Sequence, residues 1–216
     1  MVFGLYAGEQ LLGRWRLSSK RHGTADELAW QLHGMFNQWG QSTTDIAGII
    51  AASVVPQVDP TLAEACQRIC GRSVAFVGSD EIRTGMAIDY KHPREVGADR
   101  IVNAVAAHAR HGAPVIVLDC GTATTFDVVS PAGHYAGGLI LPGIEVACEA
   151  LSARAAKLPA FSPQPVPFGI GRDTISSMQI GSYWGTIAAL DGIIERLCAM
   201  PGYGNAPIVA TGGLSR

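Results

Sequence analysis

The stretch D-C-G-T-A-T-T-F-D, Asp119 to Asp127, constrains the fold of this chain more than any other segment. It continues the apolar run Pro114 to Asp119, which predicts a buried strand, and Gly121 permits a tight turn whose backbone can approach a ligand closely. Free amide groups and threonine hydroxyls in such a turn suit phosphate oxygens. The Asp119 carboxylate would repel phosphate unless a cation lay between them, so the pattern also predicts a bound ion. An ordinary hairpin turn with threonines as strand formers is the simpler alternative.

A weak internal repeat supports the ligand-binding interpretation. Thr125 to Gly138 comprises a strand, a glycine turn and a strand, and Val2 to Gly13 matches it in kind and spacing. The second copy is preceded by a strand that ends in D-C-G-T, whereas only Met1 precedes the first copy. We therefore expect the first copy to lack its opening strand and turn.

The remaining pattern predicts a mixed α/β protein rather than a bundle or a sandwich. A capping box at Thr24 to Glu27 opens one amphipathic helix, and Asp59, as N-cap before Pro60, opens a second helix that Gly71 ends. Apolar runs and hairpin chemistry predict strands at Val2–Tyr6, Leu11–Leu17, Ile46–Val55, Ser73–Val77 and Pro207–Gly213, with further helices over about 99–111 and 174–200.

Composition excludes several classes of protein. Sixteen basic residues stand against 18 acidic ones without a long basic run, so no nucleic-acid partner is expected. Five scattered cysteines without a C-x-x-C pair disfavour a zinc site and a disulfide framework. No apolar stretch approaches the roughly 20 residues that span a bilayer. We expect a soluble, cytoplasmic protein without a membrane partner.

A second candidate site is V-G-A-D-R, Val96 to Arg100. Asp99 lies at a predicted helix start, and the Arg100 guanidinium offers a fork for a carboxylate. An N-cap aspartate beside a solvated arginine is the plainer interpretation. Gly97, which permits close approach, and Tyr90 upstream favour a binding site.

Two further segments carry weaker signals. Ala136 to Gly143 predicts a strand with a terminal bend, and its Gly138 and Gly143 either line a ligand cleft or serve close backbone packing. Thr174 opens the last predicted helix, as an N-cap first and a ligand contact second.

Five motifs occur together in this chain: Y-x6-G-A-D-R, D-C-G-T-A-T-T-F-D, G-G-L-I-L-P-G, A-A-K-L-P and the Thr174 helix with G-S-Y-W-G. In this combination they resemble the type III pantothenate kinases over nearly the whole chain. The resemblance implies an actin-like kinase fold of two ribonuclease-H-like halves with mixed sheets, here residues 1–98 and 99–216. It also implies a homodimer that transfers the γ-phosphate of ATP to the 4′-hydroxyl of pantothenate, which opens coenzyme A synthesis.

The resemblance also implies roles for individual residues. Asp99 resembles the proton acceptor of the family, Thr122 its ATP contact, and Asp119 its ligand for a monovalent cation, K⁺ or NH₄⁺. Mg²⁺ is expected to enter with ATP. The implied pantothenate contacts are Tyr90, Gly97, Ala98, Asp99, Arg100 and Thr174, with Arg100 on the carboxylate.

The chain departs from the family pattern at both ends. Family members begin with a strand and an Asp-x-Gly-Asn-Thr loop, and they continue past the glycine turn at Thr211 to Gly213. We therefore expect a truncated or misassigned reading of a functional kinase, which is weakly active or inactive over these 216 residues. A non-catalytic regulator of the same family, and an actin-like kinase for another small hydroxy acid, are the alternative functions.

Overall fold

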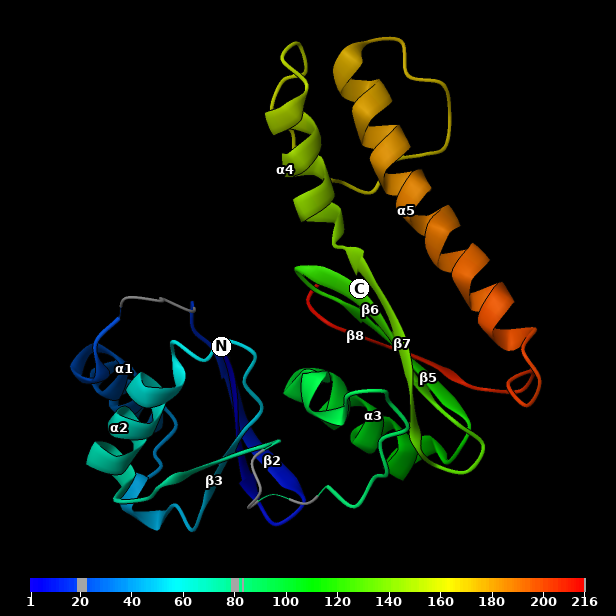
Figure 1. The fold of residues 1–216 in the computed structure, drawn as a ribbon. Coiled ribbons are helices and arrows are strands. Elements are labelled where there is room, and N and C mark those ends of the chain that lie inside the picture. Colours follow the sequence, from blue (N-terminus) through cyan, green and yellow to red (C-terminus); the bar gives the residue numbers. More distant parts are fainter. Residues whose placement is uncertain (19–22, 79–81, 83, 216) are drawn as a thin grey trace. The chain divides into compact units, whose positions relative to one another are not determined.

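The computed structural model describes residues 1–18, 23–78, 82 and 84–215. The chain divides into two compact units, which are described separately (Figure 1). Unit 1 comprises Met1–Thr84 with Gly97–Asp99, and unit 2 comprises Gly85–Val96 with Arg100–Arg216. No helix among the described residues is both long enough and apolar enough to cross a bilayer.

Unit 1 combines two helices with two separate pairs of strands. Strands β1 (Val2–Ala7) and β2 (Gln10–Arg16) form the predicted antiparallel hairpin, and β3 (Ile49–Ala51) runs parallel to β4 (Val74–Phe76). Helix α1 (Ala25–Gln38) starts at the predicted capping box, and it packs on α2 (Asp59–Cys70) through a core that includes Leu28, Leu32, Ala65 and Cys66. A short 3₁₀ turn, η1, covers Thr43–Asp45. A cavity of about 990 Å³ lies in this unit, lined by β1 and by the segment around β3.

Two predictions for unit 1 are corrected. The apolar run Ile46–Val55 was expected to be one buried strand, but β3 covers only Ile49–Ala51, because the three-residue β4 offers no longer partner, and Ile50 is 66% exposed. Asp59 is the first residue of α2 rather than its N-cap, a position that Val58 occupies. The Asp59 carboxylate instead accepts a hydrogen bond from the Ser53 hydroxyl.

Unit 2 is built on a four-stranded mixed sheet. The strands are β5 (Val115–Cys120), β6 (Ala123–Val129), β7 (Tyr135–Pro142) and β8 (Ile208–Thr211), in the order β7-β6-β5-β8. β6 is antiparallel to β5 and β7, whereas β8 is parallel to β5. The segments of the sequence repeat, β1–β2 and β6–β7, are thus both antiparallel hairpins.

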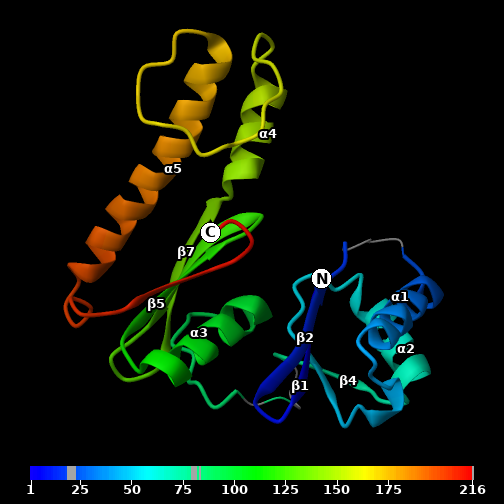
Figure 2. The ribbon, with the colours of Figure 1, turned by 180° about the vertical axis from the view of Figure 1, so that it is seen from behind.

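Helices cover both faces of this sheet. Helix α3 (Ala98–His111) follows the 3₁₀ turn η2 (Pro93–Glu95) and packs Ile101, Ala104 and Ala107 on one face. The carboxyl-terminal half of α5 (Thr174–Cys198) packs on the other face (Figures 1 and 2). Side chains of β5 alternate between the two cores, as the pleat of a strand buried on both faces requires.

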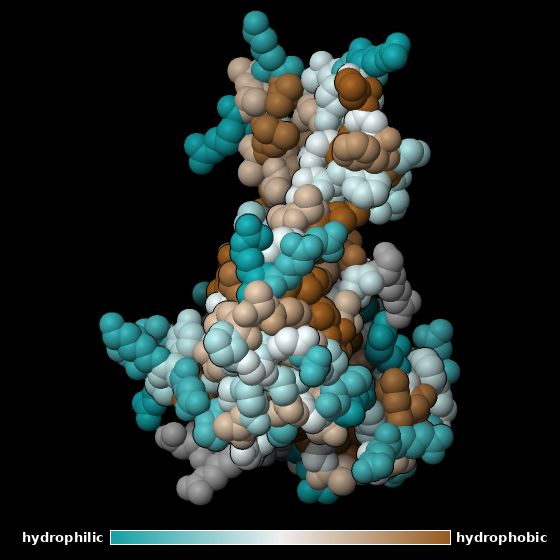
Figure 3. All heavy atoms as spheres, turned by 90° about the vertical axis from the view of Figure 1, so that its right-hand side faces the viewer, coloured by the Kyte–Doolittle hydropathy of each residue, from teal (hydrophilic) through white to brown (hydrophobic). Residues whose placement is uncertain are grey.

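Helix α4 (Ile144–Arg154) and the amino-terminal half of α5 extend beyond the sheet as an arm (Figure 2). Figure 3 shows apolar side chains gathered on this arm. Phe168 and Ile170, in the segment that leads into α5, are 77% and 92% exposed. The arm therefore carries an apolar surface that is exposed to solvent in the described part of the single chain.

The N-cap of α5 is Asp173, not Thr174 as the sequence suggested. The Asp173 carboxylate accepts a hydrogen bond from the Ser176 amide at 2.9 Å, and the Ser176 hydroxyl lies 3.3 Å from the Asp173 amide nitrogen, which completes a capping box. An aspartate with a partner three residues later satisfies two amide groups at once, so it displaces the neighbouring threonine from the cap.

Asp173→Ala is expected to lower the urea midpoint of unfolding, because the substitution removes the acceptor for the Ser176 amide. That hydrogen bond lowers the pKa of Asp173 below its ordinary 3.8. The contribution of the Asp173 carboxylate to the free energy of unfolding is therefore complete above pH 3.8, and it is lost as the pH falls through the lowered pKa. The midpoints of the two proteins should differ at neutral pH and converge in acid. Thr174→Ala is the control, and a larger loss from this variant would contradict the assignment of the cap.

Candidate active site

The predicted strand-turn-strand at Asp119–Asp127 is confirmed. β5 ends at Cys120, β6 begins at Ala123, and Asp119 pairs with Thr125 across the two strands. The amide of Gly121 donates to the carbonyl of Ala123 at 3.0 Å, which closes the turn. Asp119 is half-buried and Thr122 is exposed, so the turn presents a hydroxyl to solvent beside a partly screened carboxylate.

Two glycine segments pack against this turn. Asp119 also pairs with Thr211 of β8, and Gly212 follows with a left-handed φ of 94°. A Cβ on Gly212 would lie 2.5 Å from Asp119 Oδ1 and 2.4 Å from the Cys120 carbonyl oxygen. On the other side, the Gly143 amide donates to the Thr122 carbonyl at 3.0 Å, and a Cβ there would lie 2.3 Å from the Gly121 carbonyl oxygen. Backbone thus packs around the turn without side chains between.

Helix α3 contacts the same turn through a residue that the sequence interpretation missed. The Asn103 side-chain amide donates to Asp119 Oδ2 at 2.8 Å. The spacing in the sequence could have identified Asn103 as part of the site. It stands three positions after Arg100 and four after Asp99, which places it on the same face of the helix. The Asp119 carboxylate is therefore oriented by the helix that carries the second candidate motif.

Arg100 points into the protein. It is only 8% exposed, and its Nε donates to Asp127 Oδ1 at 2.6 Å. Its Nη2 donates to the Phe126 carbonyl at 3.1 Å, and the Tyr135 hydroxyl donates to Asp127 at 2.9 Å. The fork predicted for a ligand carboxylate therefore holds a carboxylate of the chain itself. Burial raises the pKa of Asp127, and the Arg100 charge opposes that rise.

Asp99 is exposed in the first turn of α3. It is the second residue of the helix, so it is not the N-cap that the plainer interpretation assumed. A carboxylate in the first turn is favoured by the partial positive charge of the helix end. Gly97 immediately precedes α3, whereas Ala98, its first residue, is buried.

Tyr90 is 39% exposed, and its ring lies against that of Tyr135, with 6.4 Å between the centroids. Tyr90 also covers Gly137, where an added Cβ would lie 3.5 Å from its ring. The structure therefore brings Tyr90 close to the Arg100–Asp127 pair, since Tyr135 contacts both Tyr90 and Asp127.

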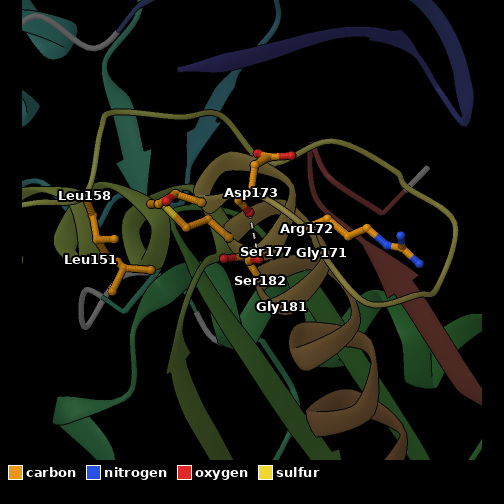
Figure 4. A pocket seen from close by; sticks show the side chains of 10 residues that line it. Leu151, Leu158, Gly171, Arg172, Asp173, Ser177, Gly181 and Ser182 are labelled. Atoms are coloured by element: carbon orange, nitrogen blue, oxygen red, sulfur yellow. Dashed lines mark hydrogen bonds between the residues drawn. The ribbon is translucent and has the colours of Figure 1, made fainter.

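Thr174 lies apart from these residues. It lines a cavity of about 830 Å³ between α4 and the start of α5, together with Leu151, Gly171, Ser177 and Met178 (Figure 4). The amino end of α5 forms the tip of the arm, away from α3 and from the β5–β6 turn (Figures 1 and 2). One chain therefore does not bring Thr174 together with Asp119 and Arg100.

The site offers oxygen ligands rather than a transition-metal cluster. Among the residues described by the structure, no three His, Cys, Asp or Glu side chains are grouped to hold a metal ion. The Asp119 carboxylate, the Thr122 hydroxyl and the carbonyls of the turn are hard oxygen donors, which suit alkali and alkaline-earth cations. The donor chemistry thus fits the predicted monovalent cation and Mg²⁺.

Comparison with known proteins agrees with this chemistry. The family described as Type III pantothenate kinase matches residues 1–196. The type III pantothenate kinase of Moorella thermoacetica is 45% identical over 215 residues, which cover 100% of this chain and 84% of that protein. The corresponding protein of Koribacter versatilis is 46% identical over 98% of this chain and 77% of its own length.

The fold is also similar to a crystal structure from Campylobacter jejuni, of a protein described as a conserved Baf family transcriptional activator. That likeness has a TM-score of 0.50 at 19% identity and covers 78% of this chain and 69% of the other, so it concerns the fold alone. Because the family match spans most of the chain and the identities exceed 40%, this chain belongs to the type III pantothenate kinase family.

Proposed function

We propose that this chain phosphorylates pantothenate on its 4′-hydroxyl with ATP, the first step of coenzyme A synthesis. The observation that carries the proposal is the identity of 45% to a type III pantothenate kinase over the whole chain. The geometry supports it, because an exposed carboxylate at a helix start and a glycine-threonine turn are the parts that phosphoryl transfer to an alcohol needs.

In the proposed reaction, Asp99 orients the 4′-hydroxyl and accepts its proton. The hydroxyl oxygen then bonds to the γ-phosphorus, and the bond from phosphorus to the β,γ-bridging oxygen breaks, which releases ADP. The exposed Thr122 hydroxyl contacts the ATP phosphates beside the turn amides. Exposure of Asp99 supports its role, since a base must reach the proton that it removes.

The proposed monovalent cation, K⁺ or NH₄⁺, is held by Asp119, and Mg²⁺ accompanies ATP. When bound, these cations neutralise phosphate charge next to the turn. Asn103 supports this assignment, because its amide occupies Asp119 Oδ2 and so fixes the direction of the carboxylate. A rate that is unchanged without K⁺ and NH₄⁺ would contradict it.

The proposed pantothenate contacts are Tyr90, Gly97, Ala98, Asp99 and Thr174. For Arg100, the bonds to Asp127 and Phe126 favour an indirect role over capture of the pantothenate carboxylate.

The hairpin present in each unit supports two ribonuclease-H-like halves of an actin-like kinase, over residues 1–98 and 99–216. ATP and free thiols at all five cysteines fit a cytoplasmic enzyme.

Asp99→Asn is expected to lower the rate of 4′-phosphopantothenate formation at least about 100-fold, because the amide cannot accept the proton. Pantothenate binding, measured by calorimetry, should change little, since the amide keeps the shape of the carboxylate. Asp191→Asn, an exposed aspartate of α5, is the matched control and should keep the rate of the unaltered chain.

The same assay tests both the role of Asp99 and the identity of the substrate. Equal rates for the unaltered chain and Asp99→Asn would contradict the role of Asp99. Faster turnover of another small hydroxy acid in a substrate panel would replace pantothenate, and binding of pantothenate without any turnover would favour a regulator.

We also propose that the chain acts as a homodimer in which the arm of one copy supplies Thr174 to the site of the other. The exposed apolar side chains of Phe168 and Ile170 support this arrangement, as does the position of Thr174 at the tip of the arm.

Mixing two inactive variants tests the dimer. In a symmetric dimer, a random mixture of Asp99→Asn and Thr174→Ala chains contains one intact site in each mixed dimer, so about a quarter of the activity should return. Each variant alone is the control. A mixture that stays as inactive as its components would contradict the exchange of Thr174 between copies.

A further inference from the structure

The Asp127 carboxylate is the most completely buried acid in the described part of the chain. Asp127 has no exposed surface, although it lies in β6 only a few residues from the exposed Thr122. Asp127 Oδ1 accepts hydrogen bonds from Arg100 Nε and from the Tyr135 hydroxyl, and Oδ2 lies 3.4 Å from the Thr125 hydroxyl. A charge buried this deeply requires such partners, since desolvation of an unpaired carboxylate is very costly.

Stability alone does not explain the Arg100–Asp127 pair. Desolvation of two charges commonly cancels their attraction, so an apolar pair of similar volume would serve the core as well. Several segments are nevertheless shaped around the guanidinium. Nη2 of Arg100 donates a hydrogen bond to the Phe126 carbonyl, and Cζ of Arg100 lies 5.9 Å from the centroid of the Tyr135 ring. A Cβ on Gly138 would lie 1.7 Å from the Phe126 carbonyl oxygen and 2.6 Å from Nη2, so the close approach of β6 requires glycine there, and its absent side chain also leaves room for the guanidinium.

The pair fastens the beginning of α3 to the sheet. Arg100 directly follows Asp99, and Asn103 lies one turn later on the same helix face. Arg100 bonds to β6 through Asp127, whereas Asn103 bonds to β5 through Asp119. The first two turns of α3, which include Asp99, are therefore held at two points on adjacent strands.

We propose that Asp127 is a positioning residue, which holds Arg100 inside the protein and thereby fixes the first turn of α3 and the carboxylate of Asp99. This inference rests on the proposed function of Asp99 as the base. Asp127 is fully buried, so it acts through Arg100 without touching the substrate. A misplacement of about 1 Å in a reacting group can lower the rate about 100-fold. A carboxylate that acts as a general base at the end of a helix therefore needs such an anchor.

Asp127→Asn tests the proposal, because the amide keeps the shape of the side chain and removes the charge that holds Arg100. We expect kcat to fall about 100-fold. The dissociation constants of pantothenate and ATP should change less than threefold. The control is Ile116→Val, a fully buried change in β5 on the sheet face opposite α3, which should lower stability and keep kcat. A fall in kcat no larger than that of Ile116→Val would overturn the proposal.

Arg100→Lys separates positioning from direct capture of the substrate. The test compares binding of pantothenate with binding of its analogue in which an alcohol replaces the carboxylate. If Arg100 positions α3, Arg100→Lys and Asp127→Asn lower kcat and leave the preference for the carboxylate unchanged. Loss of that preference in either variant would show that Arg100 binds the substrate carboxylate, and it would overturn the proposal.

Hydrogen exchange gives a readout that does not depend on turnover. Asp127→Asn should speed amide exchange in the first turns of α3 and leave α5 unchanged. Faster exchange in α3 together with an unaltered chain that phosphorylates nothing would reject the proposed function and keep the anchor. Unchanged exchange in α3 of an active enzyme would reject the anchor alone.

Discussion

Unit 2 is organised around the buried ion pair between Arg100 and Asp127. Because both side chains are buried, each charge must remain paired, and this requirement fixes helix α3 against strand β6. Tyr135 joins the pair from β7, and Gly138 lies beside both the guanidinium and the Phe126 carbonyl. The beginning of α3 and the turn-proximal half of the β6–β7 hairpin thus share one electrostatic constraint.

The candidate site follows from that constraint. Once α3 is held by Arg100, Asn103 meets Asp119 at the end of β5, where the turn is enclosed by the glycine segments at Gly143 and Gly212. Thr122 is exposed in this turn, and Asp99 is exposed in the first turn of α3. Buried contacts thus lie beneath the exposed residues that we propose to contact the substrate.

Local patterns predicted much of this arrangement. The capping box at Thr24, the glycine hairpins and the strand before Asp119 depend on neighbours in sequence, and each is confirmed. The prediction of one strand over Ile46–Val55 failed because the length of β3 depends on its partner β4. The sequence pattern gave no sign of the direction of the Arg100 side chain, because its partner Asp127 lies 27 positions later. The N-cap of α5 is Asp173 rather than Thr174, because Asp173 and Ser176 satisfy two backbone amides between them. Family resemblance named Asp99 and Asp119 but gave no sign of Asn103.

A crystal structure with pantothenate and a non-hydrolysable ATP analogue would show whether Asp99 faces the substrate while Arg100 stays bonded to Asp127. We expect the 4′-hydroxyl of pantothenate within hydrogen-bond distance of the Asp99 carboxylate. We also expect Arg100 Nε to remain bonded to Asp127. A structure in which Arg100 has turned to the pantothenate carboxylate, or in which the hydroxyl lies beyond the reach of Asp99, would contradict these expectations.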